Sequence, residues 1–378
     1  MKKALIIFTV VLSGFIGMGA AVYNNDELFE ISKNIEIFSN LFKELNTYYV
    51  DDIDPSKLMK VGIDAMVETL DPYTNYFSET QIETWRYLTE GKYEGIGANV
   101  QTIGDEITII EPYEGCPAFE AGLKAGDVIV SIDGQSTKGK NSSDLGVLLR
   151  GVPGSAITID VRRPGVKEIK SFKMNRGEIK MSNAPYSGII RDHVGYVSLT
   201  TFTQDAGKNI ADAIKTMKKE DPLLKGVILD LRDNGGGLLM EAINIVNIFV
   251  PNGVEVVSTR GKVRDWDKTF TTQRPALDET LPVVVLINKH SASASEIVSG
   301  AIQDLDRGVI IGQRSYGKGL VQNTKDIGFN SKLKLTTSKY YIPSGRCIQS
   351  VSYRNGEPLD VPDNERHVFR TKGGRKVL

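Results

Sequence analysis

The chain has 378 residues, of which 40% are hydrophobic and 25% are charged, as in an ordinary globular protein with two or three domains. Its 46 Lys and Arg residues are balanced by 47 Asp and Glu residues, so it lacks the basic excess expected of a nucleic-acid-binding protein. Its three histidines are far apart and no HExxH or CxxC pattern occurs, so we expect no metal site and no cofactor.

The first 24 residues predict export. Lys2 and Lys3 precede an apolar stretch at 4–22, and the small residues at 19–21 suit cleavage of a signal peptide. About twenty apolar residues also suffice to span a bilayer, so a single membrane anchor fits equally well. Because positive residues stay inside, we expect the rest of the chain to be periplasmic or anchored to the outer face of the cytoplasmic membrane.

Residues 25–90 predict a helical region. Apolar residues recur at helical spacing from Leu28 to Leu45, and a second helix should begin at Asp54, with Pro55 as its first residue, and end before Asp71. The apolar stripes can pack within the region. They can equally form the arm of a homodimer, because two short helices make a thin core of their own.

Residues 91–174 change to short strands and turns. The loop Gly95-Ile96-Gly97-Ala98, the strand patterns at 107–110 and 128–133 and a helix that ends near Gly151 resemble a PDZ domain. In such a domain a glycine loop leaves backbone N–H groups free to hold a terminal carboxylate, while the peptide adds to the sheet edge. The four loop residues Gly95, Ile96, Gly97 and Ala98 are therefore the predicted peptide-binding residues.

Residues 183–355 alternate strand and helix, which predicts a layered α/β domain. We expect strands at 194–201, 227–231, 283–287 and 309–311, helices at 210–217, 238–250 and 297–305, and closing strands near 333–335 and 339–342.

Ser293 and Lys318 are the candidate nucleophile and general base. Ser293 lies in a small-residue turn between an apolar strand at 283–287 and a helix, an arrangement that exposes a hydroxyl beside backbone N–H groups. A lysine acts as a base only if its site favours the neutral form, which requires a pKa lowered from near 10.4 toward roughly 7 by desolvation. Glycines on both sides of Lys318 would allow a close approach.

Each residue also has a simpler interpretation. Ser293-x-x-Glu296 is a capping box, so Ser293 can serve only to begin the helix. Residues 312–318 match the phosphate-loop pattern GxxxxGK. The next residue, however, is Gly319 where that loop needs Ser or Thr, and a strand rather than a helix is expected to follow.

The glycine run 235–237 follows a buried strand pattern and precedes an apolar helix, so it lies at the carboxyl end of a strand, where open α/β sheets place their sites. The N–H of Gly236 or Gly237, with that of Ala294, is the predicted oxyanion hole. The alternative is a plain turn between strand and helix.

Four blocks carry a resemblance to the carboxyl-terminal processing peptidases, also called tail-specific proteases: residues 291–297, 317–322, 230–237 and 341–349. The resemblance covers most of the chain and implies a crotonase-like or ClpP-like protease fold. It makes Ser293 the nucleophile, Lys318 the base and Gln322 the group that orients the lysine. Residues 318 and 322 would share one face of a strand, which agrees with that role.

The same resemblance suggests two further residues. Family members have an acid at Asp304, which is a support residue at best and otherwise a carboxylate on a solvated helix end. Arg150 aligns with a PDZ arginine that senses the bound tail, and is otherwise a solvated cation at a helix end. His290 adjoins the serine loop, but sequence neighbours seldom face one another productively, so it is a weak alternative base.

We therefore expect an α/β multidomain protein: an exported serine endopeptidase that recognises protein C-termini through its PDZ domain. The alternatives are a non-catalytic PDZ peptide-binding adaptor with a vestigial protease domain and a nucleotide-binding protein. Family members usually continue beyond the 356–378 tail. Cys116 and Cys347 fall in different predicted domains and neither has catalytic surroundings.

Overall fold

The computed structural model describes residues 26–81, 91–140, 142–354, 357–360 and 367–377. The predicted export segment therefore lies outside the described residues. The chain divides into two compact units, Met1–Met66 and Val67–Leu378. None of the helices in the described ranges combines the length and apolar composition that a membrane span requires.

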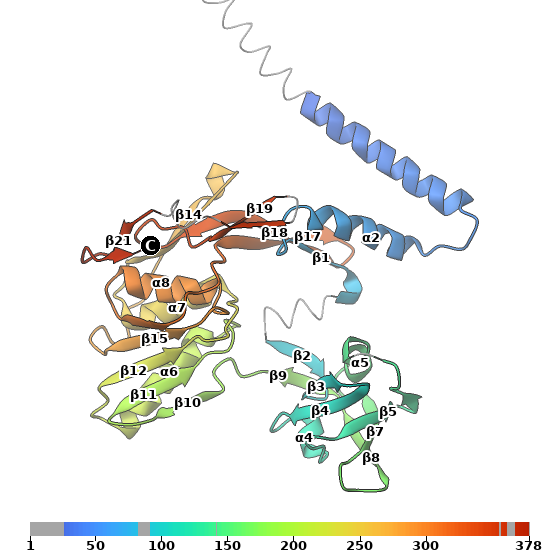
Figure 1. The fold of residues 1–378 in the computed structure, drawn as a ribbon, viewed down its shortest axis with the longest axis horizontal. Helices are drawn as coiled ribbons and strands as arrows, with labels where there is room; N and C mark the ends of the chain where they lie inside the picture. The colour runs from blue at the N-terminus through green and yellow to red at the C-terminus, as the bar shows by residue number, and fades with distance from the viewer. Residues whose placement is uncertain (1–25, 82–90, 141, 355–356, 361–366, 378) are drawn as a thin grey trace, which may run out of the picture. The chain divides into compact units, whose positions relative to one another are not determined.

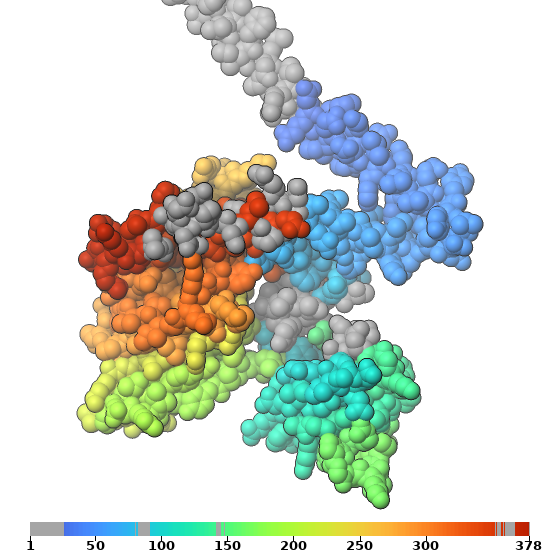
Figure 2. Space-filling view, in the orientation of Figure 1, coloured from blue at the N-terminus to red at the C-terminus, as the bar shows by residue number. Residues whose placement is uncertain are grey.

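The first unit is helical, as predicted. One helix covers residues 26–48, and α2 covers Pro55–Glu68 (Figure 1). The Asp54 carboxylate accepts the backbone N–H groups of Ser56 and Lys57 at 2.9 and 3.1 Å, which confirms the predicted start of α2. Many apolar side chains of the first helix are exposed, and they belong to the blue surface in Figure 2: Leu28, Phe29, Ile31, Ile35, Ile37, Phe38 and Leu41.

The PDZ region folds as a six-stranded antiparallel sheet around its own core of buried isoleucines and leucines. Its strand order is β3-β4-β5-β7-β8 with β6 beside β5, and a separate pair, β2 and β9, brings its two ends together. The elements are β2 (Lys92–Gly95), β3 (Ala98–Ile103), β4 (Glu106–Pro112), α4 (Pro117–Glu120), β5 (Val128–Ile132), β6 (Gln135–Ser136), α5 (Ser142–Leu149), β7 (Ala156–Arg162), β8 (Ile169–Asn175) and β9 (Gly177–Lys180).

Residues 183–355 contain the predicted α/β alternation. Four strands are parallel, in the order β11-β12-β15-β16, with β10 antiparallel at one edge. The register aligns Val197, Leu229 and Val285, all of them buried, as expected of a parallel sheet covered on both faces. The elements are β10 (Tyr186–Ile189), β11 (Val194–Ser198), α6 (Ala206–Glu220), β12 (Gly226–Asp230), α7 (Leu239–Phe249), β15 (Val283–Ile287), α8 (Ala294–Asp304) and β16 (Val309–Gly312).

A second sheet has the order β1-β18-β13-β14, with β17 also paired to β18. Figure 1 shows α7 and α8 between the two sheets, and one buried core joins side chains of these helices to Val257 of β13 and Tyr340 of β18. The elements of this sheet are β1 (Asn75–Phe77), β13 (Glu255–Gly261), β14 (Lys268–Thr271), β17 (Leu320–Gly328) and β18 (Ser331–Tyr341).

The remaining elements are short. They are two 3-10 turns, η1 (Glu79–Gln81) and η2 (Arg264–Trp266), and two hairpins made of β19 (Val351–Arg354) with β20 (Glu357–Asp360) and β21 (Phe369–Arg370) with β22 (Lys376–Val377).

Two sequence-based interpretations can be judged against these strands. The strand expected after Gly319 is confirmed as β17, which excludes the alternative phosphate-loop interpretation of residues 312–318 because that loop needs a following helix. The two closing strands expected near 333–335 and 339–342 are one continuous strand, β18. Strand β1, which follows the helical region in sequence, pairs with β18 and so belongs to the protease sheet.

Candidate active site

Ser293 lies between β15 and α8, as the N-terminal cap of the helix. Its backbone has φ 56° and ψ −113°, a conformation that residues with a side chain rarely adopt and that costs roughly 1–3 kcal/mol. Such strain is typical of a residue held for function. The preceding loop is fixed by Ser291, whose hydroxyl donates to the carbonyl of Leu231 at 2.7 Å.

Glu296 confirms part of the capping interpretation and adds to it. Its carboxylate accepts the N–H of Ser293 at 2.8 Å, as in a capping box. The same buried carboxylate accepts the N–H groups of Lys318 at 2.8 Å and Gly317 at 2.6 Å, and the hydroxyl of Ser315 at 2.7 Å. Desolvation raises the pKa of Glu296, and the four donors oppose that rise. One side chain thus joins the serine loop to the lysine loop.

Lys318 is a half-buried lysine with a perturbed ionisation. Burial and, to a smaller extent, the positive charge of Lys334 lower its pKa to about 8, against the opposing effects of Asp71 and Glu296. The ammonium lies 4.1 Å from the centre of the Tyr73 ring. The shift has the direction expected of a lysine that acts as a base.

Ser293 and Lys318 line one cavity of about 460 Å³. Gly236, Gly237, Ala294, Gln322, Lys334 and Tyr340 also line it. Among the described residues we find no hydrogen bond between the Ser293 hydroxyl and the Lys318 ammonium. The structure therefore brings the predicted nucleophile and base to one cavity but does not bond them to each other.

The glycine loop lies directly against the serine. A Cβ atom added to Gly236 would lie 2.8 Å from the Ser293 Cβ and 2.9 Å from the Ala294 nitrogen, and Gly236 has φ +100°, so only glycine fits. The N–H of Gly236, a predicted oxyanion donor, donates instead to Asn234 Oδ1 at 2.9 Å. Within the described chain we find no acceptor for the N–H groups of Ala294 and Gly237. The oxyanion role stays a prediction, with Gly237 the better placed of the two glycines.

Gln322 lies on β17 and lines the cavity, as its spacing from Lys318 predicts. Its amide Nε2 donates to the carbonyl of Leu320 and to Thr336 Oγ1, each at 3.1 Å. Thr336 in turn donates its hydroxyl to Asp71 Oδ1 at 3.2 Å. Gln322 is thus held in place, but no bond to Lys318 is present among the described contacts, so its orienting role stays a prediction.

Residues 193–354 match the model of peptidase family S41, and residues 108–163 match the model of the PDZ domain. The chain is 36% identical over 357 residues to the carboxy-terminal-processing protease of Bartonella bacilliformis, an alignment that covers 94% of this chain and 81% of that protein. This chain belongs to the carboxy-terminal-processing protease family.

A second relative agrees with this assignment. A probable CtpA-like serine protease of Staphylococcus aureus is 32% identical over 366 residues, covering 95% of this chain and 72% of that protein. The solved structure of the photosystem II D1 C-terminal processing protease is 26% identical, with a TM-score of 0.48, and covers 86% of this chain and 91% of that one. The chain is a serine protease of family S41 that carries a PDZ domain.

Asp304 of this protease is buried at the end of α8, so the alternative of a solvated carboxylate is wrong. It forms an ion pair with Arg346 at 3.2 Å and accepts the N–H of Ser344 at 3.1 Å. It does not line the cavity that contains Ser293. Its role as a support residue stays a prediction. His290 is exposed and does not line that cavity either, which disfavours it as the base.

The predicted peptide-binding loop connects β2 to β3 in the PDZ domain. Its Ile96 and Gly97 carbonyls accept the N–H groups of Ala118 and Tyr113, at 2.8 and 2.9 Å. Gly97 has φ +75°, and a Cβ there would lie 2.3 Å from the Cβ of Cys116. Arg150 is the half-buried residue after α5, and its N–H donates to the carbonyl of Gly146. None of these contacts tests peptide binding, which stays a prediction.

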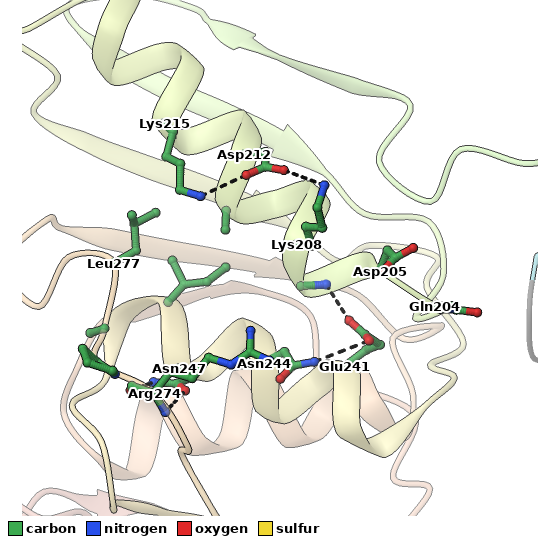
Figure 3. Close-up of a pocket in the computed structure, with 15 residues that line it drawn as sticks. Gln204, Asp205, Lys208, Asp212, Lys215, Glu241, Asn244, Asn247, Arg274 and Leu277 are labelled. Carbon is green, nitrogen blue, oxygen red and sulfur yellow. Dashed lines mark hydrogen bonds and ion pairs between the residues drawn. The ribbon is translucent and has the colours of Figure 1, made fainter.

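A larger hollow of about 720 Å³ lies between α6 and α7 (Figure 3). Several of its charged side chains have partners: Asp212 accepts from Lys208 and Lys215, and Glu241 accepts the backbone N–H of Gly207 at 2.7 Å. It contains neither Ser293 nor Lys318 and offers no comparable pair of nucleophile and base.

In the described ranges no three His, Cys, Asp or Glu side chains gather in a way that would hold a metal ion. Cys116 and Cys347 are both free thiols, and burial raises the pKa of each. Neither lines the cavity of Ser293.

Sequence reasoning missed Tyr73, Asp71 and Lys334 as neighbours of the base. Tyr73 and Asp71 come from a segment more than two hundred residues before Lys318, and nothing local signals that pairing. Lys334 and Tyr340 alternate on one face of β18, so the strand period could have placed them together had the strand been recognised as continuous.

Proposed function

We propose that this chain is an exported serine endopeptidase in which Ser293 is the nucleophile and Lys318 the general base. The observation that carries the proposal is the shared cavity: a strained serine and a lysine with a pKa of about 8 line it together. Glu296 supports it by binding the backbone N–H groups of both residues. No cofactor is needed for this chemistry.

In the proposed reaction, Ser293 Oγ bonds to the scissile carbonyl carbon while its proton passes to neutral Lys318. The carbonyl oxygen becomes an anion, which the N–H groups of Ala294 and of Gly237 or Gly236 would bind. The ammonium of Lys318 then donates its proton to the leaving amine as the C–N bond breaks. Water attacks the acyl-enzyme in the same way, with Lys318 again accepting a proton, and releases Ser293.

Substrates are proposed to be proteins or peptides with accessible C-termini. The fold of the PDZ domain and the glycine loop at Gly95–Ala98 support this, because such loops present backbone N–H groups to a terminal carboxylate. Arg150 lies at the end of α5 and is the proposed sensor of the bound tail.

Export, membrane contact and dimerisation are further proposals. Lys2, Lys3 and the apolar stretch after them support export, with the segment either cleaved or kept as an anchor. The exposed apolar side chains of helix 26–48 support a homodimer through the N-terminal helices. Cell fractionation tests export and membrane contact. Sedimentation of an Ile31→Glu, Ile35→Glu double variant tests the homodimer.

The deciding experiment labels the protein with a serine-reactive phosphonate and measures cleavage of an unfolded protein substrate. Ser293→Ala should abolish both labelling and cleavage. Lys318→Ala should abolish cleavage and strongly slow labelling, and the double variant should be no worse than either single one, because the residues act as a unit.

The non-catalytic PDZ adaptor is the second candidate, and the same experiment separates it. An adaptor would bind C-terminal peptides yet show neither labelling nor cleavage. If Lys318→Ala instead kept near-normal turnover, the protein would still be a protease, but Lys318 would not be its general base.

A further inference from the structure

The segment 71–77 belongs to the protease site although it follows the helical region in sequence. Strand β1 pairs with β18, matching Asn75 to Lys334 and Phe77 to Lys332. The buried Asp71 carboxylate accepts the N–H groups of Tyr73 and Thr74, at 2.8 and 2.9 Å. The turn before β1 is therefore fixed against the strand that lines the active-site cavity.

Tyr73 is held in this turn with its ring toward the base. The ring centre lies 4.1 Å from Lys318 Nζ, well within the range of a cation–π contact. The hydroxyl donates to that of Tyr316 at 3.3 Å and lies 3.1 Å from that of Tyr353. The Tyr353 ring also packs edge-on against Tyr73, with 5.9 Å between centres. The hydroxyl contacts and the perpendicular Tyr353 ring fix the Tyr73 ring, and Lys318 lies over its face.

We propose that Tyr73 is a positioning residue for the general base: its ring face binds the ammonium form of Lys318, the form that the lysine takes after accepting the proton of Ser293. This inference rests on the proposed function. A cation is attracted to the face of an aromatic ring and a neutral amine much less so, which means that the contact strengthens as the proton moves. The stabilisation therefore develops during the reaction step itself.

Lys318 needs such a partner because most of its surroundings oppose its charge. Desolvation and the positive charge of Lys334, from β18, both disfavour the ammonium. Asp71 before β1 and Glu296 on α8 favour the ammonium. Both oxygens of Glu296, however, already accept hydrogen bonds from four other donors, none of which is the ammonium. Within the described part of the chain, the Tyr73 ring is the group placed directly against the ammonium.

Tyr73 does not line the cavity that contains Ser293. A bound peptide would therefore not need to touch it, and its loss should change kcat and leave KM near its original value. A purely structural residue would instead lower stability without moving the ionisation of Lys318. These two readouts separate a positioning role from packing.

The test compares Tyr73→Leu with Tyr73→Phe, and uses Tyr76→Leu as the matched control. Phe keeps the ring and removes the hydroxyl contacts, while Leu removes the ring. Tyr76 lies in the same segment, and its hydroxyl is near Ser331, away from the base. In Tyr73→Leu the alkaline limb of the kcat profile should move down by about 0.4 to 1.5 pH units, and the plateau above it should fall severalfold as the base weakens. Tyr73→Phe and Tyr76→Leu should keep the original midpoint.

A second readout does not depend on turnover. Lysine labelled with carbon-13 at Cε reports the ionisation of Lys318 by NMR, with its signal identified in a Lys318→Arg protein. Fluorinated phenylalanines at position 73 keep the shape of the ring and weaken its negative face. The pKa of Lys318 should fall progressively along that series, even if Tyr73→Leu fails to fold.

An unchanged Lys318 titration in Tyr73→Leu or along the fluorinated series would overturn the inference and leave Tyr73 as packing. If the wild-type protein neither cleaves nor labels, the proposed function fails, and the NMR series still decides whether the ring binds the ammonium.

Discussion

The backbone N–H groups of Ser293 and Lys318 donate to the same carboxylate oxygen, Oε2 of Glu296, at 2.8 Å each. The other oxygen accepts from Gly317 and Ser315. The serine loop and the lysine loop therefore cannot separate without breaking hydrogen bonds to a buried charge, which cost more to lose than neutral ones. This link fixes the backbones of the two residues and leaves their side chains free to meet substrate.

Replacing Glu296 with Gln tests that link. Whichever way the amide turns, its NH₂ group faces at least one backbone N–H that then loses its acceptor: those of Ser293 and Lys318 on one side, or that of Gly317 on the other, where only the Ser315 hydroxyl can turn to accept. We expect a loss of about 2–5 kcal/mol in the free energy of unfolding, measured by urea denaturation. Labelling of Ser293 by a phosphonate should slow by at least an order of magnitude, because the base no longer keeps its position.

Ser299→Ala is the matched control on the same helix, since that hydroxyl bonds the Ser295 carbonyl and does not line the cavity of Ser293. It should leave labelling unchanged. Normal labelling in a folded Glu296→Gln protein would mean that the shared carboxylate does not hold the pair.

The rate should depend on pH through Lys318. Its pKa is lowered to about 8, so the active neutral form makes up roughly a tenth of the lysine at pH 7 and nearly all of it at pH 9. Activity should therefore rise with pH through about 8 and then level. His290→Ala should keep this limb, because His290 does not line the cavity. If the rate instead rises near pH 6.5 and this rise disappears in His290→Ala, then His290, and not Lys318, is the base.

Thr336→Val tests the connection between Asp71 and Gln322. The hydroxyl of Thr336 donates to Asp71 and accepts from the Gln322 amide, so valine removes both bonds without changing the volume much. We expect a loss of about 1–3 kcal/mol in stability and a fall in kcat as Gln322 loosens. Thr337→Val is the control, because Thr337 instead accepts from Asn323. Equal kcat values for the two variants would show that the position of Gln322 does not affect catalysis.

Local signals were enough to predict many of the helices and strands and to single out two candidate site residues. Asp54 and Pro55 predicted the start of α2 because capping depends on the nearest backbone N–H groups alone. The strand, small-residue turn and helix around Ser293 and the glycines beside Lys318 marked the two as candidates. The local pattern left a capping box and a phosphate loop open, and the resemblance of four sequence blocks to a family gave the residues their predicted roles.

Neighbours supplied by distant segments could not be found in this way. Tyr73 reaches Lys318 only because β1 pairs with β18, and strand pairing across such a separation leaves no local trace. The sequence also could not decide whether Gly236 or Gly237 is the predicted oxyanion donor. That depends on the orientation of the Asn234 side chain, whose Oδ1 accepts the Gly236 N–H. The sequence shows where the glycines lie, but it does not show which acceptor each backbone N–H group binds.

Lys334 gives a prediction with the opposite sign to that for Tyr73. Its positive charge lowers the pKa of Lys318, so Lys334→Met should raise that pKa and move the alkaline limb to higher pH. Activity at pH 7 should fall while the rate at pH 10 is retained. The control is Lys332→Met on the same strand, which pairs with Asp326 and does not line the cavity. A limb that moves to lower pH in Lys334→Met would contradict the electrostatic assignment.

The last prediction concerns the tail of the substrate. A PDZ loop holds a free carboxylate by backbone N–H groups, so amidation of the substrate C-terminus removes the charge that these groups bind. With the scissile sequence unchanged, recognition of the substrate should lose the free energy of a charged hydrogen bond, about 1.5–3 kcal/mol. The cleavage rate at sub-saturating substrate should therefore fall roughly ten- to a hundredfold.

Gly97 supplies the variant that locates this effect. A side chain at Gly97 would meet the Cβ of Cys116 at 2.3 Å, so Gly97→Ala must displace the loop, whereas Gly104 has the same left-handed φ and nothing within 4 Å of an added Cβ. Gly97→Ala should therefore erase the difference between free and amidated substrates, and Gly104→Ala should keep it even though both substitutions strain the backbone. Cleavage rates of one unfolded protein with each kind of end, compared across the two variants, decide the matter. Equal rates for the two ends in the unmodified protease would show that it does not select substrates by a free carboxylate.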